Sequence, residues 1–199
     1  EEKNMYADNP FSVLYEAFLK QLYKNHPYGQ QPIVGFTEHL KNPRLSKMME
    51  FFRTYYVANN MALILTGNFD SEKIKPIINE KFGIWPKREV PKFPVYDEKP
   101  FVGREEVNVK LTPIAIGIMS FRAVPNNHPD ELILDLCSEL LSNQGETGFL
   151  NKLVNDNKIL MAQSQPMLNN DLGSIIIFFA PKIVGQKLES AEQLVLQQI

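Results

Sequence analysis

Residues 174–180 read Ser-Ile-Ile-Ile-Phe-Phe-Ala, and the stretch from Ile175 to Ala180 is the longest uninterrupted apolar run in the chain. A helix that spans a membrane needs about 20 apolar residues, so this run is far too short to cross a bilayer. A short apolar run bounded by turn residues is typical of a buried strand. We therefore predict strands at residues 159–163 and 174–180, and no membrane span.

The composition is that of a globular protein with a sizeable core. The chain has 199 residues, 44% of them hydrophobic, and 21 basic against 23 acidic side chains give a net charge of −2. At about 150 residues per domain, this length allows one large domain or two small ones. The two signs of charge are interspersed, so the sequence has no basic patch for nucleic acid or an anionic membrane surface. We exclude both classes of partner.

The first half of the chain predicts three helices, a loop and a strand, from the spacing of apolar residues and the capping signals. In order, these are a helix from Pro10 to about Lys24, an irregular loop over residues 25–43, a helix capped by Ser46, and a buried strand over residues 61–66. The third helix starts at Asp70 or Ser71 and is expected to end at a left-handed Gly83. Its inward-facing residues are predicted to be Ile74, Ile77, Ile78 and Phe82.

A proline-rich stretch over residues 86–100 is predicted to be an extended linker between domains. Beyond it, residues 107–111 and 114–124 are predicted to form an antiparallel pair of strands. Three helices are expected at residues 129–142, 149–154 and 185–199, the first with Leu132, Leu136 and Leu140 on one side.

This order of elements decides the fold class. Neither half alternates strand and helix, as a doubly wound parallel sheet requires. No glycine-rich phosphate-binding motif occurs in the sequence, which removes the main support for nucleotide binding. We predict an α+β fold with mixed, mainly antiparallel sheets and packed helices.

Few side chains offer chemistry. His26, His39 and His128 lie far apart in the sequence and have no partner at helical spacing, so each is interpreted as a structural or surface residue. Cys137 lies in an apolar helical pattern and is predicted to be a buried, inert thiol. The remaining concentration of reactive groups is Glu1-Glu2, which composition alone would explain as a solvated acidic helix start.

An ordered set of short motifs changes that interpretation. The set comprises Glu1-Glu2-Lys3-Asn4-Met5-Tyr6-Ala7-Asp8-Asn9-Pro10, His26-Pro27-Tyr28-Gly29, Pro32-Ile33-Val34-Gly35, Tyr55-Tyr56 with Asn59-Asn60-Met61, and Thr66-Gly67-Asn68-Phe69-Asp70. It resembles the inverzincin zinc metallopeptidases, the family of pitrilysin, insulin-degrading enzyme and mitochondrial processing peptidase. Phe101-Val102-Gly103 and His128-Pro129-Asp130 resemble the opening of that family's second, related domain.

The resemblance implies two domains, each only partly represented. Residues 1–85 would be the C-terminal half of the first peptidase-like domain, residues 86–100 a linker, and residues 101–199 the N-terminal half of the second. It also implies a zinc site with two histidines and a general-base glutamate from an H-x-x-E-H helix, and a third ligand that matches Glu2. Glu1 would support that ligand.

No H-x-x-E-H motif occurs in the chain, so we expect it to lie N-terminal to Glu1 in a longer parent protein. The parent would be a zinc-dependent metalloendopeptidase acting on peptides or unfolded segments, with a second peptidase-like domain or subunit closing a chamber, and the fragment alone would be inactive. The alternatives are a catalytically inactive structural or partner subunit of the same fold, and an unrelated α+β binding domain. The compartment stays open: periplasm or cell envelope for a bacterial member, cytoplasm otherwise.

Overall fold

The computed structural model describes residues 2–110 and 115–199. Contacts within the chain divide it into two units, which we describe separately. The sheet unit comprises the residues up to Gln30 together with residues 98–199, and the helical unit comprises residues 31–97. These units differ from the predicted division at residues 86–100, which concerns peptidase-like domains and stays a prediction.

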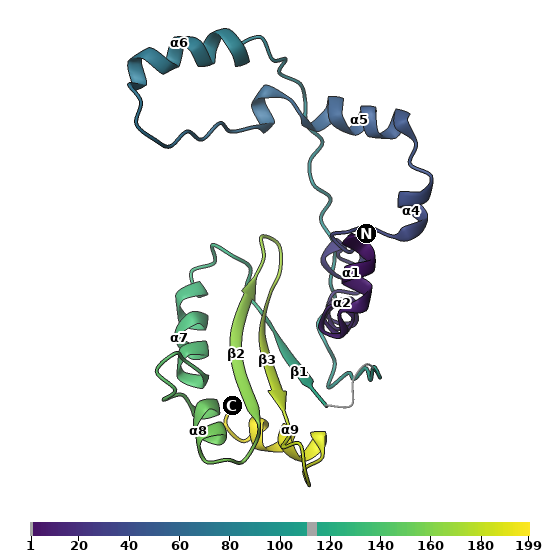
Figure 1. Ribbon diagram of the computed structural model, residues 1–199, viewed down its shortest axis with the longest axis vertical. Coiled ribbons are helices and arrows are strands. Elements are labelled where there is room, and N and C mark those ends of the chain that lie inside the picture. Colours follow the sequence, from purple (N-terminus) through teal and green to yellow (C-terminus); the bar gives the residue numbers. More distant parts are fainter. Residues whose placement is uncertain (1, 111–114) are drawn as a thin grey trace. The chain divides into compact units, whose positions relative to one another are not determined.

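The sheet unit is built on an antiparallel sheet with the order β1-β3-β2, so that the last strand in sequence lies between the other two (Figure 1). The strands are β1 (Gly117–Ala123), β2 (Met161–Leu168) and β3 (Gly173–Ala180). The predicted strands at residues 159–163 and 174–180 are thus found, with the first shifted toward its C-terminal end. The structure is α+β, as the sequence predicts.

The predicted pairing of residues 107–111 with 114–124 is wrong for the residues that the structure describes. Residues 107–110 form no strand, residues 111–114 lie outside the described residues, and β1 pairs instead with β3, where Ile118 lies opposite Phe178. The physical reason is burial. Strand β3 is buried along most of its length on both faces, and this central position gives it a neighbour on each edge.

One face of the sheet forms the main hydrophobic core with α8 (Phe149–Asn155) and α9 (Leu188–Leu196). Both helices lie where the sequence predicts them. The buried members of this core are Leu150, Leu153, Ile159, Ala162, Ile177, Phe179, Ala191 and Val195.

The opposite face is in contact with α2 (Pro10–Leu22). The rings of Phe11 and Phe178 are 5.8 Å apart, and the Tyr15 hydroxyl lies 3.1 Å from the sulfur of Met167 on β2. Side chains alternate along a strand, so Phe178 points away from the face that carries the main core. Helix α2 confirms the predicted helix from Pro10, with Asn9 accepting hydrogen bonds from the first turn as its N-cap.

Helix α7 (Glu131–Leu141) has the opposite orientation to the one its leucines suggest. Leu132, Leu136 and Leu140 share one side as predicted, but all three are exposed, whereas Ser138 is buried against the sheet. Cys137 is exposed too, so the prediction of a buried thiol is wrong. The small side chain of Ser138 fits at the contact between α7 and β2. Its hydroxyl can be buried there because it forms a hydrogen bond with the hydroxyl of Ser164.

Two short helices lie within the predicted loop over residues 25–43, which is therefore not wholly irregular. These are α3 (Pro27–Gln30) and α4 (Thr37–Lys41). Each is little more than one turn: α3 itself contains Pro27 and Gly29, whereas α4 lies between Gly35 and Pro43. The next helix, α5 (Leu45–Tyr55), follows Arg44 rather than a Ser46 cap.

Residues 61–66 form neither helix nor strand, and their apolar side chains are largely exposed. The prediction of a buried strand there is wrong for this structure, because a strand needs a partner and the described residues provide none. The helix after it, α6 (Ser71–Phe82), is capped by Asp70 as predicted. Its Ile77 and Phe82 are exposed rather than inward, because no described element covers that side.

Gly83 also differs from its prediction, since its φ of −63° is right-handed and its amide donates to the Asn79 carbonyl, as in a helix.

Asn59 and Asn60, which precede residues 61–66, have clear structural roles. The 3₁₀-helix η1 (Ala58–Asn60) follows α5, and the Asn60 side chain donates to the Tyr55 carbonyl at the end of α5. The Asn59 side chain donates to and accepts from the backbone of Arg88, at 2.8 and 3.0 Å.

Candidate functional site

The predicted metal ligand lies at the start of the sheet unit. Helix α1 (Glu2–Asp8) begins at Glu2, is joined to α2 by Asn9 alone, and contacts α2. Glu1 lies outside the described residues. The structure therefore places Glu2 on a helix, as expected for the motif, while the ligand role of Glu2 and the supporting role of Glu1 stay predictions.

His26 belongs to a polar cluster that the sequence did not predict, and its other members are Tyr23, Glu98, Arg122 and Asp171. It is 1% exposed, and its ring Nε2 lies 3.3 Å from a carboxylate oxygen of Asp171, in the loop between β2 and β3. Its Nδ1 accepts a hydrogen bond from the Tyr28 amide at 3.2 Å. Both ring nitrogens are thus engaged within the protein. His26 has a structural role, in agreement with the interpretation of its sequence context.

The other two histidines are also engaged locally. His39 packs edge-on against Phe36 in the helical unit, and Nδ1 of His128 accepts from the Asp130 amide. Within residues 2–110 and 115–199, no three His, Cys, Asp or Glu side chains gather closely enough to hold a metal ion. No described helix is long and apolar enough to cross a membrane.

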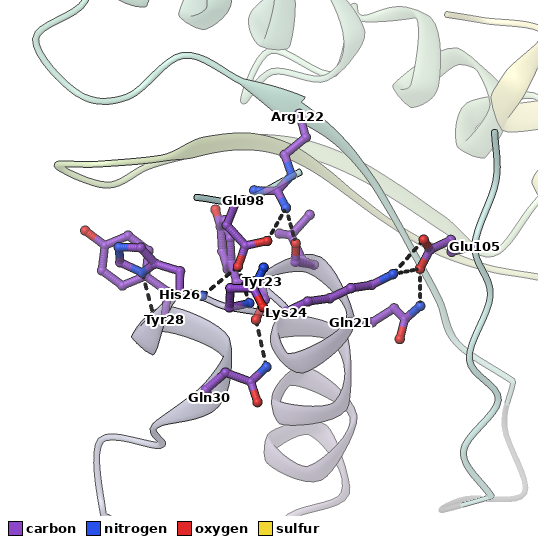
Figure 2. Close-up of polar contacts among 11 residues, drawn as sticks. Gln21, Tyr23, Lys24, His26, Tyr28, Gln30, Glu98, Glu105 and Arg122 are labelled. Atoms are coloured by element: carbon purple, nitrogen blue, oxygen red, sulfur yellow. Dashed lines mark hydrogen bonds and ion pairs between the residues drawn. The ribbon is translucent and has the colours of Figure 1, made fainter. Parts of the chain in front are cut away.

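The Glu98 carboxylate is the second member of the cluster (Figure 2). Its side chain is only 2% exposed, and one oxygen accepts hydrogen bonds from the amides of Asn25 and His26, the latter at 2.6 Å. The other oxygen lies 3.3 Å from Nη2 of Arg122. Burial alone would raise the pKa of Glu98, but the two amides and the Arg122 charge outweigh it and hold the pKa below its usual value.

Arg122 on β1 connects this carboxylate to α2. Its Nη2 also donates to the Leu22 carbonyl, at the last residue of the helix. The centre of the guanidinium lies 5.0 Å from the Tyr23 ring and 5.1 Å from the Phe101 ring, so both aromatic rings are within cation–π distance. Its Nε and Nη1 are buried and have no hydrogen-bond partner among the described residues, which makes the aromatic contacts an important part of its environment.

Tyr23 and Glu105 complete the arrangement. Tyr23 is fully buried, and this burial raises the pKa of its phenol, partly offset by Ser174 and Arg122. Near the surface, the Glu105 carboxylate accepts from Nζ of Lys24 at 2.6 Å and from the side-chain amide of Gln21 (Figure 2). The end of α2 is therefore held by two carboxylates, one buried and one half-exposed.

Sequence reasoning missed Glu98, Arg122 and Asp171. One signal was available, because Arg122 is a charged residue inside an otherwise apolar predicted strand, where a buried charge needs a partner. Nothing local marks Glu98, which follows several charged residues of the proline-rich stretch. The cluster contains no nucleophile with an adjacent base, so its chemistry is that of a hydrogen-bonded anchor.

The chain belongs to the M16 peptidase family, since residues 44–199 match the family model described as the peptidase M16 inactive domain. This confirms the family that the sequence motifs resemble.

Among curated proteins, the chain is similar to the zinc protease PqqE of Helicobacter pylori, with 25% identity over all of this chain and 46% of that protein. The crystal structure of a protease from Helicobacter pylori matches 96% of the chain and 47% of that protein, with a TM-score of 0.74 and 21% identity. The structure of the first half of the periplasmic protease PqqL from Escherichia coli matches 99% of the chain and 43% of that structure, with a TM-score of 0.71 and 16% identity. The chain thus spans about half the length of these proteins.

Proposed function

We propose that this chain is part of a zinc-dependent metalloendopeptidase that hydrolyses peptides or unfolded segments, to which it contributes Glu2. The observation that carries the proposal is the match of residues 44–199 to an M16 domain, preceded in the same chain by a helix that begins at Glu2. A catalytic zinc takes three protein ligands and a water, and glutamate is one of the ligand types it accepts. Glu2 would supply one ligand, with Glu1 beside it in support.

The described residues of this chain do not fit a complete zinc site. His26 is buried against Asp171, and no described group of three ligand-type side chains is close enough to hold a metal. The other two ligands and the general base are proposed to belong to residues N-terminal to Glu1 in the whole protein. The zinc would there activate the attacking water, and the part of this chain is limited to one carboxylate and the scaffold that holds it.

A catalytically inactive structural or partner subunit of the same fold is the alternative. The description of the matched model as an inactive domain favours it in part. In both cases we propose a second peptidase-like domain or subunit as partner, and the existence of a structure of one half of PqqL supports a protein built from such halves. PqqL is named periplasmic, which supports the same compartment for this chain.

Metal analysis and a quenched-peptide assay on the whole protein test the proposal. Glu2→Gln should lower zinc content and hydrolysis rate by about tenfold or more, because it removes a charged ligand. Mutation of residues that only hydrogen-bond to a metal ligand already lowers metal affinity or activity by about that factor. Glu1→Gln should have a smaller effect. Glu16→Gln, an exposed carboxylate on α2, is the matched control and should have none. The 199-residue chain alone should bind no stoichiometric zinc and hydrolyse no peptide.

Each outcome is decisive. Wild-type activity in the Glu2→Gln protein would refute the ligand role of Glu2. A wild-type protein without zinc or peptidase activity would refute the proposed function and support the inactive subunit.

A further inference from the structure

We propose that Arg122 and Glu98 are positioning residues for the helix that contains Glu2: they fix the end of α2 on the sheet and thereby set the place of α1. The inference rests on the proposed function, because it takes Glu2 as a metal ligand. By this proposal, Arg122 and Glu98 help to position Glu2, which lies far from both of them in the sequence.

The register of the sheet brings Arg122 to α2. Arg122 lies opposite Ser174 on β3, on the same face as Phe178, and this is the face that α2 contacts. The last carbonyls of a helix have no partner within the helix, so they are available to a donor from elsewhere. Arg122 fills this role by donating to the carbonyl of Leu22.

Glu98 fixes Asn25 and His26, which follow the end of α2. Its carboxylate accepts from the amides of Asn25 and His26, while its other oxygen pairs with Arg122. One buried ion pair therefore ties together the end of α2, the loop behind it and strand β1 (Figure 2). The sequence separations are long, since residues 22–26, 98 and 122 meet at this point.

Two other contacts of α2 with the sheet are less directional. The Phe11–Phe178 pair is an aromatic contact, which tolerates sliding and rotation, and the Tyr15 hydroxyl donates to the sulfur of Met167, which is only a weak acceptor. Hydrogen bonds to charged groups are stronger and depend on geometry. We therefore assign to Arg122 and Glu98 a leading part in setting the register of α2 along the sheet. Because only Asn9 separates α2 from α1, a shift of α2 would be passed on to Glu2.

The shape of the guanidinium matters as well as its charge. Arg122 lies within cation–π distance of both Tyr23 and Phe101 while one nitrogen reaches both Leu22 and Glu98. A lysine has the charge but neither the planar face nor the fork of donors. Arg122→Lys should therefore keep the protein folded but hold α2 less firmly.

The test uses the whole protein with Arg122→Lys, Arg122→Met and Glu98→Gln. Arg104→Met is the matched control, because Arg104 is a half-exposed arginine that pairs with Glu106 and Glu192 rather than with Glu98 or Leu22. Three properties are measured: amide hydrogen exchange by mass spectrometry, zinc per chain, and kcat and KM for a quenched peptide. We expect faster exchange confined to residues 2–26, with β3 still protected. Zinc content and kcat should fall about tenfold in Arg122→Met, while KM stays within about twofold.

Two results would overturn the inference. One is unchanged exchange in residues 2–26 together with unchanged zinc content in all three variants. The other is faster exchange throughout β3 in Arg122→Lys, which would show that the pair supports the whole fold rather than the place of α2. A wild-type protein that binds no zinc would instead refute the proposed function, and exchange in residues 2–26 would still decide whether the pair anchors α2.

Discussion

The hydroxyls of Ser138 and Ser164 lie 3.0 Å apart at the buried contact between α7 and β2. Ser142 extends this contact, because its hydroxyl accepts from the Ser164 amide at 2.7 Å and donates to the Ser164 carbonyl at 3.2 Å. Helix α7 is thus attached to the sheet by serines, while its leucines are exposed.

Ser138→Ala should lower the free energy of unfolding by about 1 kcal/mol, because it leaves the buried Ser164 hydroxyl without this partner. Ser138→Ala with Ser164→Ala should cost less than the sum of the two single changes, since both hydroxyls are then gone. Urea unfolding of the four proteins measures this coupling. Strictly additive effects would contradict the hydrogen bond between the two hydroxyls.

Glu98 should make the stability of the protein sensitive to acid. Its pKa in the folded protein is lower than the value of about 4.3 expected in the unfolded chain. The stabilisation is therefore fully present above that value and is lost as the pH falls through the lower, folded pKa. Glu98→Gln should lower stability at pH 7, and the difference from wild type should shrink below about pH 4. Urea unfolding across this range tests the prediction, which a pH-independent difference would contradict.

Gly29→Ala should destabilise the contact between α3 and the end of α2. A Cβ at Gly29 would lie 2.2 Å from the Tyr23 carbonyl oxygen and 2.4 Å from that of Leu19, so the backbone would have to move. We expect a loss of about 1–3 kcal/mol in thermal or urea unfolding. Gly145→Ala is the control, because its Cβ would come no closer than 3.3 Å to the Asn143 side chain. Equal stability of the two variants would contradict the close approach.

Asp70→Ala should weaken the start of α6. The Asp70 carboxylate accepts from the Glu72 amide at 2.9 Å and is close to that of Lys73, which is the geometry of an N-cap. The expected cost is about 1 kcal/mol, measured by hydrogen exchange in residues 71–82. Ser71→Ala should have little effect, because Ser71 is already inside the helix. A larger effect of Ser71→Ala would move the cap to that residue.

Features with local causes were predictable from the sequence. Asn9 before Pro10 and Asp70 before Ser71 are capping signals that need only a few neighbouring residues, and both helices begin where these signals lie. The apolar run at residues 175–180 predicts a strand for the same reason, since a short apolar run bounded by turn residues is a local signal.

Features that depend on distant partners were not predictable. The periodicity of α7 identifies a leucine side, but which side meets the sheet depends on Ser164, which belongs to another element. The apolar stretch over residues 61–66 predicts a strand, yet pairing needs a neighbour that no local pattern supplies. For the candidate site, the motif places Glu2 on a helix. The pairing of Arg122 with Glu98 is a contact between residues 24 positions apart that no periodicity encodes.

The order β1-β3-β2 has a consequence for the synthesis of the chain. Ribosomes make proteins from the N-terminus, so β1 and β2 both emerge before β3, the strand with which each of them pairs. Until residues 173–180 have left the exit tunnel, neither edge strand can form its ladder, and the charged end of α2 has no sheet to dock on. The nascent protein would therefore expose unpaired strand edges and the apolar face of α2 together, and this is the interval in which a chaperone would be most needed.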